Sequence, residues 1–84
     1  MGTMTYFVVL PFIRNEDGDL CAVEPKEARS ADQARRYAAT LAEKHGGAIA
    51  FSRTGDPQLG DWEDAEILAR VGEVPADLAE YTSE

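Results

Sequence analysis

Five carboxylates crowd the stretch of eleven residues from 56 to 66: Asp56, Asp61, Glu63, Asp64 and Glu66. Carboxylates close together can bind Mg²⁺ or Ca²⁺, act as an acid–base pair, or dock against a cationic surface. No histidine, glycine-rich phosphate loop or second carboxylate cluster stands near them in the sequence. We therefore expect a solvated acidic loop, and we expect that any partner it binds is a protein with a basic surface.

Trp62, the single tryptophan of the chain, stands in the middle of these acids. An exposed aromatic side chain ringed by charge is typical of a protein-interaction hot spot. The alternative, which we favour, is that Trp62 folds back over the sheet and fills the core. On the interaction hypothesis, the partner-binding residues are Asp56, Asp61, Trp62, Glu63, Asp64 and Glu66.

A second set of oxygen ligands alternates at Asn15, Asp17 and Asp19, as in a calcium-binding loop. The EF-hand pattern then requires glycine at its sixth position and glutamate at its twelfth. Those positions hold Leu20 and Lys26, so the pattern fails. We interpret this segment as a polar hairpin turn.

Cys21 and His45 are the only cysteine and the only histidine. A catalytic Cys–His dyad would need the two side chains together with a third, orienting group. A core position for Cys21 and a position at the end of a helix for His45 are simpler interpretations. The sequence predicts no catalytic residues, no metal site and no cofactor.

The charge of the chain is unevenly spread along the sequence. Residues 1–55 hold seven acidic and seven basic side chains, whereas residues 56–84 hold nine acids and only one base, Arg70. The formal net charge of −8 thus belongs to the last 29 residues. A field of one sign repels polyanions and attracts cationic partners, which argues against direct nucleic-acid binding.

The length of 84 residues allows one domain, which we place at residues 1–75, followed by a frayed or disordered acidic tail at residues 76–84. A domain this small is a candidate for homodimerisation, because a dimer buries additional surface. The longest apolar run, from Tyr6 to Ile13, is far shorter than the ~20 residues of a membrane span. With one thiol and no signal-peptide pattern, we expect a cytoplasmic protein.

Residues 5–14 are rich in β-branched and aromatic side chains and are apolar on both alternating faces, which predicts a strand covered on both sides. Pro11 cannot donate to a ladder, so the strand should bulge, end early or be an edge at that point. The Asp17-Gly18 pair predicts a tight turn, and residues 19–24 a returning strand.

A helix is predicted over residues 31–45. Ser30 and Gln33 form an S-x-x-Q capping box, and an alanine-rich apolar stripe recurs at helical spacing after it. Gly46 and Gly47 end the helix. Its outer face carries Arg29, Arg35, Arg36 and Lys44. Acidic neighbours interrupt this basic face, so we expect it to be solvated or paired within the chain.

Residues 48–53 are a predicted strand and residues 54–61 a loop rich in glycine and proline. Residues 62–71 fit either a strand or a helix, and we favour a strand that begins near Asp64. The prediction is a two-layer α+β fold of ββαββ order. It has a mainly antiparallel, four-stranded sheet with one helix packed on one face.

This order of elements resembles several groups of small bacterial proteins known only as domains of unknown function. The residues that carry the resemblance are 6–9 (YFVV), 30–34 (SADQA) and 46–48 (GGA). The opening strand and alanine-rich helix are also similar to the cell-division peptidoglycan-binding repeat domain, although the membrane anchor that precedes that periplasmic domain has no counterpart here. Both resemblances imply architecture and no activity, and the alanine- and arginine-rich helix suggests a GC-rich bacterial source.

From the sequence we expect a non-catalytic, cytoplasmic interaction or regulatory module with an acidic docking segment. One alternative is a small-ligand or divalent-metal-binding protein that uses the carboxylates of residues 56–66. A third is an acidic mimic of nucleic acid that occupies the basic groove of another protein.

Overall fold

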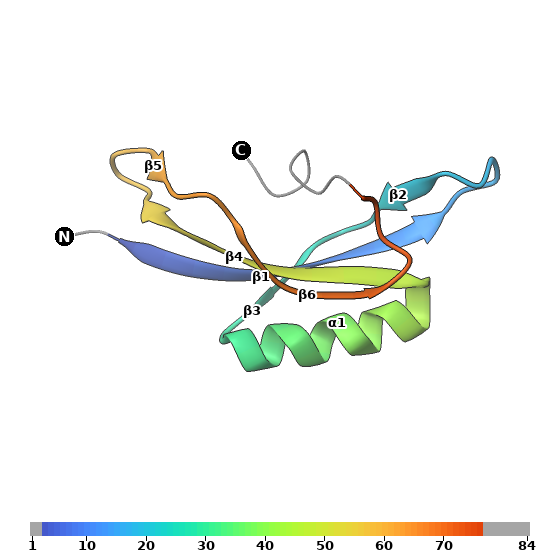
Figure 1. Cartoon of the computed structure of the whole chain (residues 1–84). Helices are drawn as coiled ribbons and strands as arrows, with labels where there is room; N and C mark the ends of the chain where they lie inside the picture. The colour runs from blue at the N-terminus through green and yellow to red at the C-terminus, as the bar shows by residue number, and fades with distance from the viewer. Residues whose placement is uncertain (1–2, 77–84) are drawn as a thin grey trace.

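The computed structural model describes residues 3–76, which form a small α+β fold with one helix and a curled antiparallel sheet (Figure 1). In the described residues the sheet has six strands. The elements in chain order are β1 (Met4–Arg14), β2 (Leu20–Ala22), β3 (Lys26–Ala28), α1 (Ala31–His45), β4 (Gly47–Asp56), β5 (Asp61–Trp62) and β6 (Glu66–Gly72).

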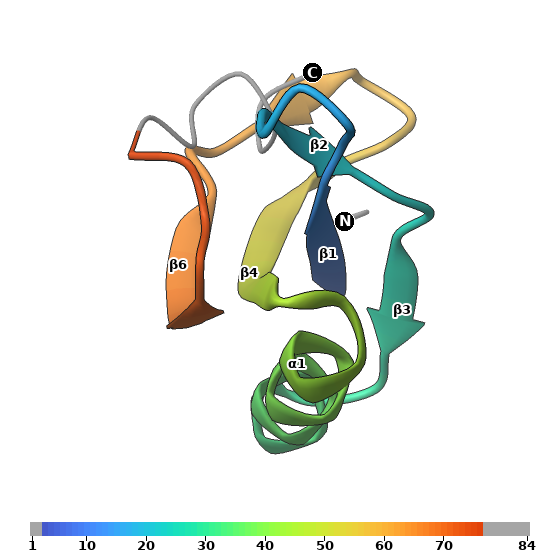
Figure 2. The ribbon, with the colours of Figure 1, turned by 90° about the vertical axis from the view of Figure 1, so that its right-hand side faces the viewer.

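The two long strands β1 and β4 pair along nearly their whole length, from Met4 opposite Gly55 to Phe12 opposite Gly47. The short strands flank this central pair. β2 and β3 both join the outer edge of β1, while β5 and β6 both join the outer edge of β4. Figure 2 looks along the strands and shows α1 beneath β1 and β4, with β3 and β6 at the two margins.

Pro11 lies inside β1, fully buried, and the strand continues through it. The strand pairing along the outer edge of β1 is interrupted at this position: β2 pairs with residues 12–14 of β1 and β3 with residues 7–9. The carbonyl of Pro11 accepts the N–H of Val23 at 3.0 Å, so its nitrogen faces the same outer edge. The missing donor therefore interrupts the partner strand instead of ending or bulging β1.

The helix begins and ends where the sequence predicts, because both caps form. The Ser30 hydroxyl accepts the Gln33 N–H at 3.1 Å, and the Gln33 side chain accepts the Arg29 N–H at 2.7 Å. At the other end Gly46 adopts φ of 116° and donates its N–H to the Ala42 carbonyl at 2.7 Å. Only glycine takes this left-handed conformation without strain.

The face of α1 that meets the sheet is made of Ala34, Ala38 and Ala42, all buried. They pack with Val9, Ala48 and Ala50 of the two central strands. Alanine on both sides lets the helix axis lie close to the sheet, so this layer is thin and has no room for larger side chains.

The opposite face of the sheet carries a second apolar cluster. Leu10, Phe12, Ile49 and Phe51 are at most 8% exposed and form its centre. Half-buried side chains from the flanking segments, Leu20, Ile67 and Val74 among them, pack against it. The prediction that β1 is covered on both faces is therefore confirmed.

The predicted α+β class, the first hairpin and the helix are confirmed, whereas the four-stranded ββαββ arrangement needs correction. The structure adds β3, which the sequence analysis did not anticipate, and β5, which lies in and after the predicted loop. β4 extends to Asp56, three residues into that loop. The strand favoured within residues 62–71 is present as β6, two residues later than expected. The predicted tail at 76–84 lies, apart from Ala76, outside the described residues.

Within residues 3–76, no helix has the length and apolar character needed to cross a membrane.

The close packing of alanines between α1 and the sheet leads to a testable prediction. Ala38 is fully buried and Ala39 is exposed. We expect Ala38→Leu to lower the free energy of unfolding by about 1–3 kcal/mol, because the added atoms overpack the layer. Ala39→Leu should change it by less than about 0.5 kcal/mol. Urea unfolding of the two variants beside the parent tests this, and equal stability of both would contradict the described packing.

Candidate functional site

One end of the β1–β4 pair projects beyond the helix and forms what we call the arm, residues 3–6 and 53–63 (Figure 1). β4 runs out to Asp56, turns through residues 57–60 and returns as β5. Asp56 organises this turn: its side chain accepts the N–H of Gln58 at 2.9 Å, and its carbonyl accepts that of Gly60 at 2.8 Å. Asp56, the first of the predicted site residues, thus stabilises the turn in addition to carrying a negative charge.

Trp62 lies on the arm, half-buried, and is part of neither core cluster. Its ring packs against Tyr6, with ring centroids 5.6 Å apart, and the Arg53 guanidinium lies 4.8 Å from its centroid. Tyr6 and Arg53 are direct cross-strand neighbours. Trp62 thus packs against side chains of the sheet, but it does not fill the core as the favoured interpretation expected, because it lies on the arm, half-buried and outside both clusters.

Gly55 makes this packing possible. It is buried opposite Trp62, and a Cβ placed on it would lie 2.7 Å from Cε3 of the indole and 2.3 Å from the Asp61 carbonyl oxygen. The close approach of β4 to β5 therefore requires glycine at this position.

A shallow hollow of about 390 Å³ lies at the tip of the arm. It is lined by Thr3, Gly55, Asp56, Asp61, Trp62 and Glu63. The structure thus brings four of the six predicted site residues together, while Asp64 and Glu66 are exposed outside the hollow.

The carboxylates of the arm are not neutralised by ion pairs within residues 3–76. No three side chains of histidine, cysteine, aspartate or glutamate in that range approach one another closely enough to hold a metal ion. What the hollow presents is negative charge beside a half-buried indole that the guanidinium of Arg53 already contacts. The carboxylates favour a cationic group through charge.

Tyr6 and Arg53, which contact the ring of Trp62, are not among the site residues that the sequence predicts. Both stand outside the acidic stretch, in strands that are paired through a long-range register. No local pattern links either residue to Trp62, so only the pairing of β1 with β4 and β5 reveals the cluster.

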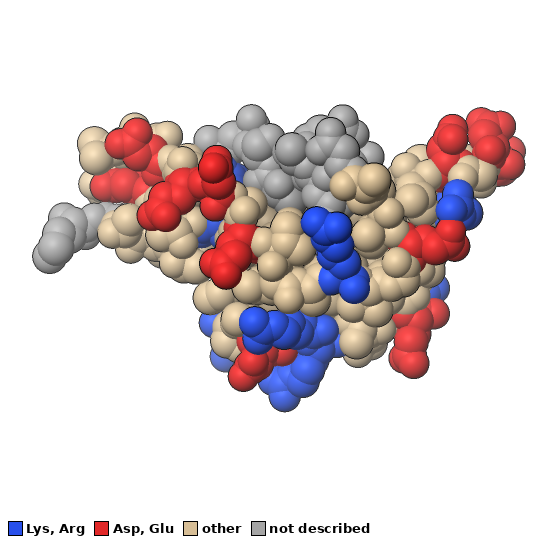
Figure 3. Space-filling model, in the orientation of Figure 1, with Lys and Arg blue, Asp and Glu red and all other residues tan. Residues whose placement is uncertain are grey.

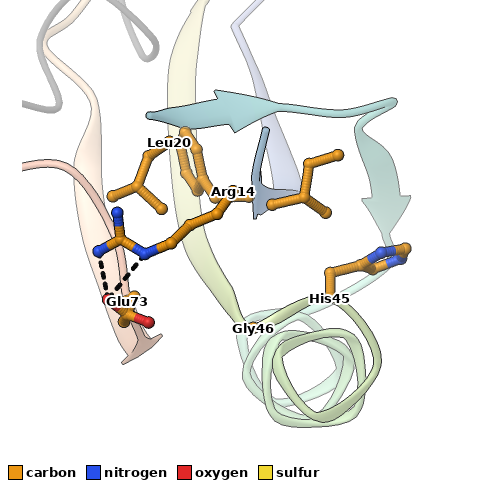
Figure 4. Close-up of a pocket in the computed structure, with 7 residues that line it drawn as sticks. Arg14, Leu20, His45, Gly46 and Glu73 are labelled. Atoms are coloured by element: carbon orange, nitrogen blue, oxygen red, sulfur yellow. Dashed lines mark hydrogen bonds and ion pairs between the residues drawn. The ribbon is translucent and has the colours of Figure 1, made fainter. Parts of the chain in front are cut away.

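A second hollow, of about 320 Å³, lies near the end of α1 (Figure 4). Here Arg14 bridges two segments: Nε donates to Glu73 Oε2 at 3.1 Å, Nη2 donates to the same oxygen, and Nη1 donates to the Gly18 carbonyl. The hydrogen bond and charge of Arg14 lower the pKa of Glu73 below its ordinary value, and Glu73 raises that of Arg14. This pair ties the first hairpin to the chain after β6.

The structure also shows where Asn15, Cys21 and His45 lie, the other residues considered as candidates from the sequence. The side chain of Asn15 accepts the N–H groups of Asp17 at 2.9 Å and Asp19 at 3.0 Å, which shapes the hairpin turn. Cys21 is a half-buried residue of β2 whose thiol contacts Asn15 Nδ2 at 3.4 Å. His45 ends the helix and lines the second hollow.

In space, acidic side chains gather at the two ends of the molecule, over the β4–β5 turn and over the β1–β2 turn (Figure 3). Basic side chains lie mainly along α1. One pair forms there, between Arg35 and Asp32 at 3.0 Å. The first 55 residues are neutral in sum, yet several of their acids gather at the β1–β2 turn while several of their bases lie along α1.

Comparison with family models, with curated proteins and with solved structures finds no match for this chain.

The Arg14–Glu73 pair should make stability depend on pH. Because the pKa of Glu73 is lowered in the folded protein, the pair stabilises the fold above the ordinary value of 4.5 and is lost as the pH falls through the lowered pKa. We expect Glu73→Gln to lower the urea midpoint at about pH 7, with the difference shrinking as the pH falls below 4.5 through the lowered pKa of Glu73. Glu43→Gln, on the exposed helix face, is the control and should show no such pH-dependent difference.

Gly55→Ala should displace the indole, because the new methyl group would overlap the present position of Trp62. The fluorescence of this single tryptophan reports its environment, and we expect its emission to move to longer wavelength as the ring becomes solvated. Gln58→Ala, in the exposed turn, should leave the emission unchanged. An unaltered spectrum in Gly55→Ala would show that Trp62 does not pack against β4.

Proposed function

We propose that this protein is a non-catalytic interaction module whose arm docks against a basic surface of a protein partner. The observation that carries the proposal is the hollow at the tip of the arm, where Asp56, Asp61 and Glu63 surround Trp62. No ion pair within the described residues offsets these three charges. A lysine or arginine of a partner would meet carboxylates and an indole together.

We expect the carboxylates and the indole of Trp62 to contribute to binding in different ways, because their typical binding free energies differ. An exposed ion pair contributes only about 0–1 kcal/mol, so the carboxylates alone supply little affinity. A buried tryptophan at the centre of an interface can contribute about 2 kcal/mol or more. The charges instead steer the encounter and raise the association rate, which salt then screens.

The arm is placed to make such a contact. It projects beyond α1, and the helix covers only the middle of the sheet (Figure 1). The exposed side chain of Leu59, 74% accessible, stands on the turn beside the hollow. We further propose a cytoplasmic location, supported by the free thiol of Cys21.

The test compares two variants with equal changes of charge. Asp61→Asn with Glu63→Gln removes two of the three carboxylates of the hollow, while Glu16→Gln with Asp17→Asn removes two exposed acids at the opposite end of the molecule. Each protein is immobilised and used to capture partners from a lysate of the source organism. We expect the arm variant to lose the partner, or to associate about tenfold more slowly, and the control to retain it.

Increasing salt should weaken the capture by the parent protein and by the control in parallel. Capture that is equally strong in the arm variant, and that survives high salt, would refute docking through the hollow. Loss in the control alone would move the interface to the β1–β2 turn.

A further inference from the structure

The outer edge of β1 is only partly covered. β2 pairs with residues 12–14 and β3 with residues 7–9, and Arg29 then turns the chain away into α1. Beyond that point no strand of residues 3–76 pairs with this edge at Met4, Thr5 and Tyr6. Figure 1 shows this part of β1 running free of β3 and α1 toward the N-terminus.

The backbone of Thr5 faces this open edge. Successive residues of a strand point their N–H and C=O groups to alternate sides. The Pro11 carbonyl faces the outer edge, where it accepts the Val23 N–H, and β1 shows no register shift between Pro11 and Met4. Thr5, six residues earlier, therefore presents one donor and one acceptor outward, and Thr5 is exposed.

The opposite margin of the sheet, formed by β6, is less suited to pairing with a further strand. β6 forms the margin beyond β4, but its register shifts opposite Ala50 and Phe51, and it carries Glu66 and Arg70. Bulges and charged residues are the devices that keep an edge strand from pairing. Met4, Thr5 and Tyr6 have no charge, proline or bulge, so this edge retains its capacity to pair.

We propose that an extended, basic segment of the partner adds as a further strand to β1 at Met4–Tyr6. This inference rests on the proposed docking function and deepens it. The open edge and the hollow lie at the same end of the molecule: Thr3, next to the edge, also lines the hollow, while Asp56 and Asp61 lie on the other side of β1, on β4 and β5. A segment that pairs with Thr5 and continues past Thr3 thus reaches the tip of the arm, where its lysine or arginine side chains meet the field of those carboxylates.

The backbone edge at Thr5 and the acidic arm recognise different properties of the segment. Two backbone hydrogen bonds at Thr5 select an extended conformation without reading side chains, as in other complexes formed by strand addition. The acidic arm selects for positive charge and steers the segment to the edge. An acidic segment of the same conformation would be repelled, as would a second copy of this arm.

The decisive variant is Thr5→Pro. Because the Thr5 N–H faces outward, proline there removes the donor that a new strand needs without removing a hydrogen bond to β4. Thr5→Ala is the matched control, since both variants lose the contact between the Thr5 and Thr54 hydroxyls at 2.9 Å. The probe is a short peptide of alternating lysine and valine, with an alternating glutamate–valine peptide as its counterpart.

We expect the lysine peptide to bind the parent and Thr5→Ala alike, and to bind Thr5→Pro at least tenfold more weakly. Binding should also slow hydrogen exchange of the Thr5 amide in the parent, a readout that does not depend on how well Thr5→Pro folds. The glutamate peptide should not bind.

Several results would overturn the inference. If Thr5→Pro binds as tightly as the parent and the Thr5 amide stays unprotected, strand addition is wrong; loss of binding in the Asp61/Glu63 variant would then leave the docking function standing. If the lysine peptide fails to bind the parent at all, strand addition is wrong, while the docking function still stands or falls with the capture of a protein partner by the parent and the arm variant. If the parent dimerises and Thr5→Pro does not, the occupant of the edge is a second copy of this chain, and the proposed partner is wrong.

Discussion

The antiparallel pairing of β1 with β4 is the constraint on which the rest of this structure depends. The two strands stay in register from Met4–Gly55 to Phe12–Gly47, and every other strand attaches to one of their outer edges. Their alternating side chains create both apolar layers: small residues face α1, and Leu10, Phe12, Ile49 and Phe51 face the other way. A slip of one residue would exchange the two layers, because side chains alternate with a period of two.

The length of this pair also produces the candidate site. α1 covers only part of the sheet, so the far end of β1 and β4 projects as an arm whose backbone and side chains have fewer neighbours. Gly55 lets β5 approach closely, Tyr6 and Arg53 hold the indole of Trp62, and Asp56 shapes the turn. The same overhang leaves Thr5 at an open edge. An acidic hollow and an unpaired strand edge therefore lie at the same end of the molecule for one geometric reason.

The net charge of a stretch of sequence does not show how its charged side chains are arranged in space. The first 55 residues sum to zero, but their acids include those of the β1–β2 turn while several bases lie on α1. The result is a molecule with two acidic ends and a partly basic helix face. Since charges more than about 8–10 Å apart are largely screened at physiological salt, each patch acts on a partner by itself. The net charge alone does not describe what a partner would meet.

Local chemistry in the sequence was enough to predict the helix with its Ser30 and Gly46 ends, the Asn15–Gly18 turn and the α+β class, because caps and turns depend on residues a few positions apart. It was also enough to single out the acidic stretch and Trp62. β3 has only three residues and β5 only two, and neither carries a strand pattern; each exists because a long strand offers it an edge. The partners of Trp62, the grouping of Asp56, Asp61 and Glu63 around it, and the break opposite Pro11 arise from pairings between distant segments. Those pairings depend on register and on which face each side chain takes, and only the tertiary structure decides them.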